Sequence, residues 1–215
     1  MTDRRPYRRE STERRRDDLI SAALDLVSEG GPQAATVRAI AQRAGVTPGL
    51  IRHYFLTKED LTRAAYQRLM DRMTADSAVV LQDGPDDPAA RLAWFVAASI
   101  SPPVVDPVAV GLWAGFLHGV QRDKAMREVH IATYLGFRDV LQSLIAALPR
   151  TVTATGLRGD AIACNAIIDG LWLEGSVLPE AFGADEIVNI GLTAIGAILQ
   201  TDLVAAKMAT GRALP

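Results

Sequence analysis

The chain has 215 residues, a formal charge of −2 and 49% hydrophobic residues, which is enough apolar surface for a sizeable core. No apolar run approaches the roughly 18 residues of a membrane-spanning helix, and the arginine-rich beginning lacks the apolar stretch of a secretion signal. The single cysteine, Cys164, excludes an internal disulfide, so we expect a cytoplasmic protein without a membrane partner.

The charge is unevenly distributed along the chain. Residues 1–72 hold 14 Lys and Arg against 10 Asp and Glu, whereas the rest of the chain holds 9 against 15. Seven of these arginines fall within the first sixteen residues. Residues 1–11 therefore predict a flexible arginine-rich arm, for which two interpretations remain open. The arm either contacts DNA phosphates or a minor groove, or it is a solvated tail.

Two longer helical patterns frame the N-terminal third. Residues 12–29 carry apolar side chains at helical spacing, until two glycines and a proline at 30–32 end the pattern. Residues 57–60, Thr-Lys-Glu-Asp, resemble a capping box and open a predicted helix that runs to about Gln82.

Between them, the sequence TVRAIAQRAGVTPGLIRHYF starts at Thr36 and holds two short helical patterns. The first, 37–44, follows a threonine whose side chain can accept a hydrogen bond from free backbone N–H groups. It ends at Gly45, because glycine tolerates the left-handed conformation that closes a helix. The second, about 48–54, follows Thr47 in the same way. Two short helices joined by a tight glycine turn predict a helix-turn-helix.

The second short helix has the width that fits a DNA major groove, while the first would cross the DNA backbone. Arg52 can reach a guanine or a phosphate, and Gly49 allows the helix to approach closely. Helix starts with free N–H groups, together with Tyr54 and Lys58, can bind phosphates. The predicted DNA-contacting residues are Thr36, Arg38, Thr47, Pro48, Gly49, Leu50, Arg52, His53, Tyr54 and Lys58. The alternative is a helical hairpin without a ligand, which would not need caps, basic groups and a basic arm together.

Three stretches, AALDLVSEGG, ATVRAIAQRAGVTPGLIRHYF and TKEDL, occur together within residues 12–66. In this combination they resemble the DNA-binding domain of TetR-family transcriptional regulators. GVTPGLIRHYF, and AIIDGLWLEG at 166–175, are similar to the BetI-like, choline-responsive branch. Many members carry an aromatic residue where this chain has Arg52, so the resemblance does not give the operator sequence.

This resemblance implies an all-α protein with an N-terminal three-helix DNA-binding domain and a larger helical regulatory and dimerisation domain. It also implies a transcriptional regulator that a small molecule controls, with repression as the usual sign. The expected division is a 1–11 arm, a 12–57 DNA-binding domain, a 58–206 ligand-binding and dimerisation domain and a 207–215 frayed tail. Helical patterns separated by prolines and glycines predict the later helices at about 88–100, 107–121, 124–148, 157–177 and 185–206.

A single short recognition helix reads few bases, so we expect a homodimer on a palindromic operator. The resemblance places its interface in the last two long helices. Small residues occur there among large ones, namely Ala161, Ala166, Gly170, Gly175, Gly191, Ala194, Gly196 and Ala197. Alternatively, these small residues serve ordinary packing within one chain.

The small-molecule effector is unknown. Asn165, Asp169 and Trp172 fall on adjacent turns of one helix, and a carboxylate among aromatic faces would suit a cationic ligand. The candidate pocket residues are Trp94, Trp113, Phe116, His118, Phe137, Asn165, Asp169 and Trp172. The alternative is that the aromatic residues are plain core and that Asp169 bonds backbone or caps a neighbouring helix.

An all-α enzyme and a helical protein-interaction module are the remaining functional alternatives. The three histidines, His53, His118 and His130, lack the spacing of a metal site, and Cys164 lies in an apolar stretch. The sequence has neither a nucleophile-elbow serine motif nor a phosphate-binding glycine loop. We therefore predict no catalytic residue, metal or cofactor. An interaction module would leave the basic recognition helix without a role.

Overall fold

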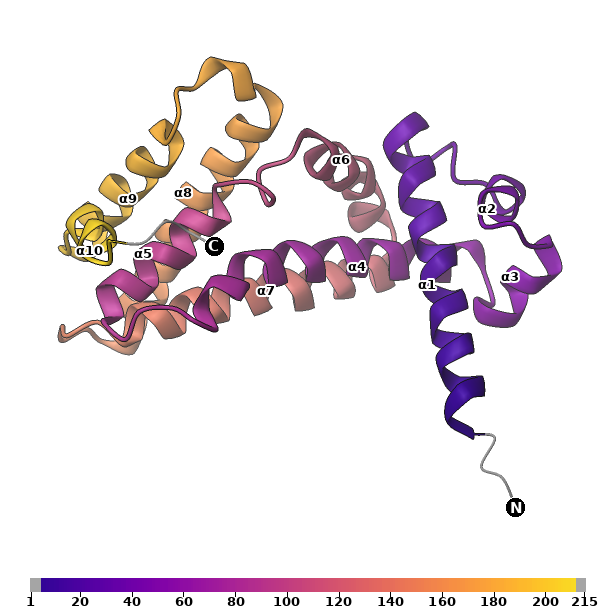
Figure 1. Ribbon diagram of the computed structural model, residues 1–215, viewed down its shortest axis with the longest axis horizontal. Helices are drawn as coiled ribbons and strands as arrows, with labels where there is room; N and C mark the ends of the chain where they lie inside the picture. The colour runs from indigo at the N-terminus through magenta and orange to yellow at the C-terminus, as the bar shows by residue number, and fades with distance from the viewer. Residues whose placement is uncertain (1–4, 212–215) are drawn as a thin grey trace. The chain divides into compact units, whose positions relative to one another are not determined.

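The computed structural model describes the chain from Arg5 to Gly211, with side chains from Thr12 onward. Every regular element in that range is a helix, which confirms the predicted all-α class (Figure 1). The α-helices are α1 Arg5–Gly30, α2 Val37–Arg43, α3 Pro48–Tyr54, α4 Lys58–Ala78, α5 Pro88–Ser99, α6 Pro107–Arg122, α7 Lys124–Ala146, α8 Ala154–Val177, α9 Glu186–Leu199 and α10 Leu203–Ala209. Short 3₁₀ turns follow α4 at Val79–Leu81 and α8 at Pro179–Ala181.

The first helix is longer than the sequence pattern indicates. Residues 5–11, expected to be part of a flexible arm, continue α1. Arg and Glu are good helix formers, and extending a helix from turns that are already packed avoids the cost of nucleation. The helix start expected at residue 12 from the cluster of arginines is therefore too late, because α1 begins at Arg5. Residues 1–4 of the expected arm, and the side chains up to residue 11, lie outside the described part.

The last predicted helix is divided in two. Gln200 takes the left-handed conformation, with φ 54° and ψ 41°, and ends α9. Asp202 then starts α10 by accepting a hydrogen bond from the Ala205 N–H, and the two helices are bent by 119°. Residues 207–209, expected to be frayed, belong to α10, whereas 212–215 lie outside the described range. Among the described helices, no single helix is long and apolar enough to span a membrane. Only the bent pair of α9 and α10, taken together, has the necessary length and hydropathy.

The chain forms two compact units. The first holds the chain up to Leu69 together with Gly111–His130, and the second holds Met70–Val110 together with the chain from Ile131 onward. Helices α4, α6 and α7 therefore contribute residues to both units. This grouping differs from the boundary after residue 57 expected from the sequence, because the first turns of α4 and most of α6 join α1–α3.

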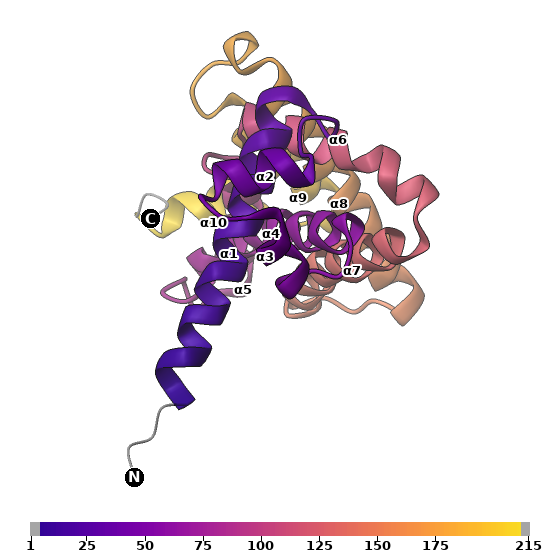
Figure 2. The ribbon, with the colours of Figure 1, turned by 90° about the vertical axis from the view of Figure 1, so that its right-hand side faces the viewer.

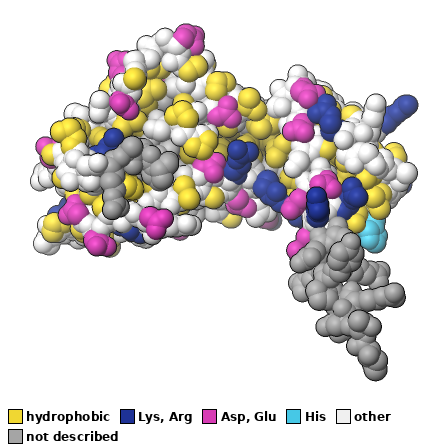
Figure 3. All heavy atoms as spheres, viewed as in Figure 1, with side chains coloured by type: hydrophobic (Ala, Val, Ile, Leu, Met, Phe, Trp, Pro, Cys, Tyr) yellow, Lys and Arg dark blue, Asp and Glu magenta, His cyan; other side chains and the backbone are white. Residues whose placement is uncertain are grey.

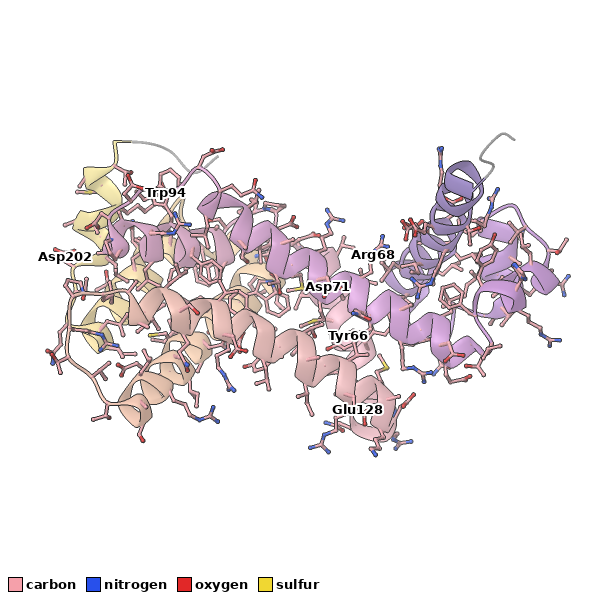
Figure 4. The ribbon with its side chains drawn as sticks, turned by 90° about the horizontal axis from the view of Figure 1, so that it is seen from below. Tyr66, Arg68, Asp71, Trp94, Glu128 and Asp202 are labelled. Atoms are coloured by element: carbon pink, nitrogen blue, oxygen red, sulfur yellow. The ribbon has the colours of Figure 1, made fainter. Side chains whose placement is uncertain are left out.

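The core of the first unit is built from the apolar faces of α1–α4. Tyr66 of α4 is fully buried, and its ring packs against Phe116 of α6 at 5.3 Å between centroids. Its hydroxyl lies 2.6 Å from Nδ1 of His130 in α7 (Figure 4). Gly115 faces the ring of Pro32 in the turn after α1. The other buried side chains include Leu19, Ile20, Ile40, Ala41, Ile51, Phe55, Leu61 and Ala65.

Ionic and cation–π contacts join the helices of this unit. Arg43 of α2 makes two hydrogen bonds to the Glu29 carboxylate of α1, at 2.8 and 2.6 Å. Arg68 of α4 pairs with Asp17 of α1. The Arg16 guanidinium lies 4.9 Å from the centroid of the Phe55 ring. These exposed pairs contribute little free energy each, so the buried apolar side chains hold α2 and α4 on α1.

Helix α5 is the centre of the second unit. Nine of its residues are buried, and a helix that is apolar around its whole circumference must be covered on all sides. It packs against α8, α9 and α10. Trp94 forms a small separate cluster with Val80 and Ala98, and the N–H of its indole is buried without a hydrogen-bond partner (Figure 4).

The small residues of α8 and α9 have different surroundings. A Cβ at Gly175 would lie 2.6 Å from Ile187, and one at Gly191 would lie 2.5 Å from Ile100, so these glycines permit close packing within the unit. Gly170, by contrast, has open space where a Cβ would stand, and Ala166 and Ala197 are exposed. Packing within one chain thus accounts for part of the small-residue pattern, and only the exposed members remain available to a partner.

The glycine that joins α2 to α3 allows a test of the helix-turn-helix geometry. Gly45 has φ +64° and open space around it, so Gly45→Ala should destabilise the fold by about 1–2 kcal/mol through backbone strain alone. Gly159, exposed in α8 with equally open space, is the matched control, and Gly159→Ala should stabilise by about 0.5–1 kcal/mol. Urea unfolding measures both changes, and equal effects at the two positions would contradict the strain argument.

Candidate DNA interface and effector site

Helix α3 presents one face to the core and the other to solvent. Ile51 is 2% exposed, and Phe55, which ends the helix, is 5% exposed. Arg52 and His53 lie on the opposite side and are exposed. Figure 2 shows α2 and α3 beside α1 in the first unit. A short helix with a buried apolar side and a polar outer side has the form of a recognition helix.

The starts of the two short helices differ in their hydrogen bonding. The Thr36 hydroxyl accepts from the Ala39 N–H at 3.1 Å, which confirms the predicted cap of α2. Thr47 has the extended backbone of a cap residue, but its side chain makes no capping hydrogen bond. The predicted bond is therefore absent at Thr47. The Leu50 N–H, which a cap side chain could accept, donates instead to the Thr47 backbone carbonyl at 3.0 Å.

The start of α4 is a reciprocal capping box, as the sequence predicted. The Thr57 N–H donates to an Asp60 carboxylate oxygen at 2.9 Å, and the Asp60 N–H donates to the Thr57 hydroxyl at 3.1 Å. The Thr57 hydroxyl donates to the same carboxylate, and these bonds lower the pKa of Asp60. Lys58 is thereby held at the first turn of α4, next to the end of α3.

The predicted DNA-contacting residues all lie in the first unit, on α2, α3, their caps and the start of α4. The exposed ones are Thr36, Arg38, Thr47, Pro48, Gly49, Arg52 and His53, and the half-buried ones are Leu50, Tyr54 and Lys58. Figure 3 shows Lys and Arg side chains beside acidic ones on the surface formed by α1–α3. Within the described part of the chain, Arg38, Arg52 and Lys58 make no ion pair, so their charges are available to phosphates or bases.

The candidate effector residues are divided between the two units. Trp113, Phe116 and His118 belong to the first, where Phe116 is buried against Tyr66 and His118 is exposed. Trp94, Phe137, Asn165, Asp169 and Trp172 belong to the second unit.

Asn165 and Asp169 of α8 form a hydrogen-bonded cluster with Tyr134 of α7. The Asn165 Nδ2 donates to the Tyr134 hydroxyl at 2.7 Å and to the Asp169 carboxylate at 2.8 Å. The Tyr134 hydroxyl donates to the same carboxylate oxygen at 2.7 Å. Tyr134 is not among the residues predicted from the sequence. It lies on α7, 35 positions before Asp169 of α8, and no sequence pattern indicates a contact between them.

The environment of this cluster further disfavours ionisation of Tyr134. Burial, followed by the hydrogen bond and charge of Asp169, raises the pKa of Tyr134 to about 12. The phenol therefore retains its proton at physiological pH and donates it to the carboxylate. Asn165 is only 2% exposed, so this polar cluster extends into a largely apolar interior.

The aromatic candidates of the second unit have roles in packing. The Trp172 indole N–H donates to the Val104 carbonyl at 2.9 Å, and the side chain is buried. Phe137 packs against Phe95 with 5.2 Å between ring centroids. Both contacts match the alternative that these rings are core. They leave the Tyr134, Asn165 and Asp169 cluster as the polar centre of the candidate site.

The described residues contain no group of three His, Cys, Asp or Glu placed to hold a metal ion. Burial, and secondarily the charge of Asp160, raises the pKa of Cys164 to about 12, so this thiol stays protonated and unreactive.

Comparison with known proteins decides the family. A family model described as BetI-type transcriptional repressor, C-terminal, matches residues 88–200. A model for bacterial regulatory proteins of the tetR family matches residues 19–65. The HTH-type transcriptional regulator BetI of Pseudomonas paraeruginosa is 31% identical over 179 residues, which cover 82% of this chain and 88% of that protein. The chain belongs to the TetR family, in its BetI-type branch.

Solved structures agree with this TetR-family membership. A transcriptional regulator from Pseudomonas aeruginosa PAO1 is similar with a TM-score of 0.77 and 29% identity, covering 90% of this chain and 94% of that one. A regulator from Saccharomonospora viridis, solved in complex with choline, has a TM-score of 0.65 and 17% identity, covering 86% and 95%. At that identity the second likeness shows the fold alone.

TetR-family membership confirms the main functional prediction. The chain is a DNA-binding transcriptional repressor and not an enzyme.

Two tyrosine variants separate the interface from the effector site. Tyr134→Phe removes a hydroxyl that bonds both Asn165 and Asp169, so it should destabilise the protein by about 1–3 kcal/mol. The Tyr54 hydroxyl has no partner in the described structure, so Tyr54→Phe should leave stability within about 0.5 kcal/mol.

The same two variants should differ in their effect on DNA affinity. Tyr54→Phe should weaken it roughly tenfold if the hydroxyl bonds a phosphate, whereas Tyr134→Phe should leave it unchanged in the absence of effector. Chemical unfolding and a duplex-binding titration measure the two properties. If Tyr54→Phe destabilised the fold as strongly as Tyr134→Phe, the assignment of the two hydroxyls would be wrong.

Proposed function

We propose that this TetR-family protein is a dimeric repressor that binds a palindromic operator through α3 and releases it when a small-molecule effector binds the second unit. The main support for DNA binding is the polar outer face of α3. Arg52 and His53 are exposed there, while Ile51 and Phe55 hold the helix on the core. As a regulator of chromosomal DNA, the protein acts in the cytoplasm.

The residues of the first unit have distinct roles in this proposal. α3 enters the major groove, and α2 crosses the DNA backbone. Arg52 reads a base, and Gly49, where a Cβ would meet only the Thr47 hydroxyl at 4.0 Å, keeps the helix surface low for close approach. Thr36, Thr47, Tyr54 and Lys58 surround α3 and bind phosphates. Arg38, Pro48, Leu50 and His53 complete the contact surface.

The operator should be sought first in the DNA upstream of the protein's own gene. Fluorescence anisotropy with that duplex and with a scrambled duplex, over a series of salt concentrations, measures both affinity and specificity. We expect tighter binding to the native duplex, with affinity falling as salt rises, because phosphate contacts release counterions. Equal, weak binding to both duplexes would contradict this choice of operator.

Arg52→Ala tests whether the central arginine reads a base. It should weaken binding to the operator by about 1–3 kcal/mol and leave binding to random DNA nearly unchanged. The control is Arg72→Ala, since Arg72 is an exposed arginine of the second unit, 74% exposed, with only an i,i+4 partner. An equal loss on specific and random duplexes would show that Arg52 contacts a phosphate.

Homodimerisation through α8 and α9 brings two recognition helices to half-sites about 34–36 Å apart. Both helices carry large apolar side chains that the single chain leaves exposed. These are Ile162, Leu173 and Val177 on α8, Leu178 just after it, and Ile190 and Ile198 on α9. The exposed small residues Ala166, Gly170 and Ala197 would let the partner helices approach closely. A second copy of the chain would cover this surface with an equivalent one.

Leu173→Glu tests the proposed interface. The side chain is 43% exposed in the single chain, so a glutamate there should not disturb folding, but in a dimer it would bury an unpaired charge. We expect roughly hundredfold weaker association, or a monomer, by analytical ultracentrifugation. Ile131→Glu on α7, where the side chain is 45% exposed, is the control that should remain a dimer. Loss of the dimer in the control alone would place the interface elsewhere.

The effector site is proposed at the Tyr134, Asn165 and Asp169 cluster of the second unit. Trp94, Phe137 and Trp172 are the further candidates in that unit, and Trp113, Phe116 and His118 stay candidates in the first. A cationic ligand suits the Asp169 carboxylate, and the related fold from Saccharomonospora viridis was solved with choline.

Helix α4 is the proposed path from effector to DNA. It begins beside α3 and contributes residues to both units, so it joins them covalently. Effector binding favours another tilt of α4, and effector and operator then weaken each other's binding by the same factor.

A further inference from the structure

One atom of the polar cluster is left without a partner. Asn165 is 98% buried, and its side-chain carbonyl oxygen, Oδ1, makes no hydrogen bond. The other end of the same amide is fully engaged, because Nδ2 donates to both Tyr134 and Asp169. The described structure has only three such buried, unpartnered side-chain atoms, and the other two belong to Trp94 and Arg150.

The orientation of the Asn165 amide follows from the charges around it. Nδ2 faces the Asp169 carboxylate at 2.8 Å. Reversing the amide would place its carbonyl oxygen against the carboxylate and would lose two hydrogen bonds, so the donor end must face Asp169. The acceptor end, Oδ1, is therefore held pointing away from the carboxylate.

A buried acceptor without a donor destabilises a fold, and native proteins keep such atoms rarely. Removing the acceptor would be simple, since a leucine has nearly the same size. An unpartnered acceptor beside a carboxylate, in the domain that binds effectors in this family, indicates a missing donor from outside the chain. A positively charged N–H donor would satisfy the acceptor and would also be attracted by the neighbouring carboxylate.

The Asp169 carboxylate is the dominant charge at the cluster. Arg138, one turn along α7 from Tyr134, acts electrostatically on the Tyr134 phenol in the opposite sense to Asp169. That opposing effect is smaller than the effect of Asp169, so the carboxylate attracts a protonated and a quaternary amine alike. A hydrogen bond to Oδ1 distinguishes the two, because a quaternary ammonium has no N–H bond to donate.

We propose that the effector is a protonated amine that retains N–H bonds, and that one of these bonds donates to Oδ1 of Asn165. This inference rests on the proposed function, because it names the ligand class of the same effector site. It differs from the expectation of a quaternary ammonium, whose methyl groups would face Oδ1 without donating a hydrogen bond. The Asp169 carboxylate balances the positive charge of the ligand. The Tyr134 hydroxyl bonds both Asp169 and Asn165 and so keeps the two side chains in place.

The test is a ligand series in which only the number of N–H bonds changes. Ethanolamine, N-methylethanolamine, N,N-dimethylethanolamine and choline all carry one positive charge at pH 7.5 and share the hydroxyethyl group. Calorimetric titration of the full-length protein without DNA should show affinity falling along the series. Ethanolamine should bind about tenfold or more tighter than choline, the effect of one charge-assisted hydrogen bond.

Three variants assign the effect to the named atoms. Asn165→Leu should remove the preference for ethanolamine, because it removes the acceptor and keeps the volume. Asp169→Asn should weaken all four amines, because it removes the charge and leaves Oδ1. Asn189→Ala, at an exposed asparagine of α9, is the control that should bind the series like the parent protein. If Asn165→Leu failed to fold, Asp169→Asn and the ligand series would still decide the proposal.

The outcomes separate this inference from the proposed function. Choline binding as tightly as ethanolamine would overturn the inference, and so would an unchanged preference in Asn165→Leu, which would mean that a buried water satisfies Oδ1. Absence of binding by all four amines, with operator binding intact, would overturn the amine assignment and leave the repressor function standing. Loss of operator binding in the parent protein would instead contradict the proposed function.

Discussion

The recognition helix depends on two buried side chains. α3 has seven residues, which is far below the length at which an isolated helix is stable in water. Its form and direction therefore come from Ile51 and Phe55, which are buried in the core of the first unit. Once these two face inward, the 3.6-residue period turns Arg52 and His53 outward. The chemistry of the proposed DNA surface is thus a consequence of core packing.

Two sets of basic residues in the first unit differ in their partners. Arg43 pairs with Glu29, Arg63 with Asp123 and Arg68 with Asp17. The Arg16 guanidinium lies over the Phe55 ring. Arg38, Arg52 and Lys58 make no ion pair with the described residues, and they lie around α3. Part of the positive charge in the first third of the sequence is therefore engaged within the unit, and part remains available for the proposed DNA contacts. Composition alone does not distinguish these uses, because both need the same residue type.

The second unit combines an apolar centre with one polar cluster. α5 is buried on nearly all sides, which fixes the positions of α8, α9 and α10 around it. Against this background, the Tyr134, Asn165 and Asp169 cluster is costly to bury unless its groups are paired. Most of them are, and Oδ1 of Asn165 is the exception. We propose that this exception marks a site for a ligand with a hydrogen-bond donor. Helices α4, α6 and α7 connect the cluster through the chain to the unit that carries α3.

The sequence by itself determined the all-α class, the helix-turn-helix with its Thr36 cap and Gly45 turn, the capping box at Thr57 and Asp60, and the family. These features are local, because caps, turns and apolar periods act over a few residues. Only the tertiary structure decided that Tyr134 joins Asn165 and Asp169, that Arg43 is engaged by Glu29, and that Gly175 and Gly191 serve packing within one chain. Those outcomes depend on residues far apart in the chain, and on left-handed Gln200, which divides the last predicted helix although nothing in its local pattern marks a break.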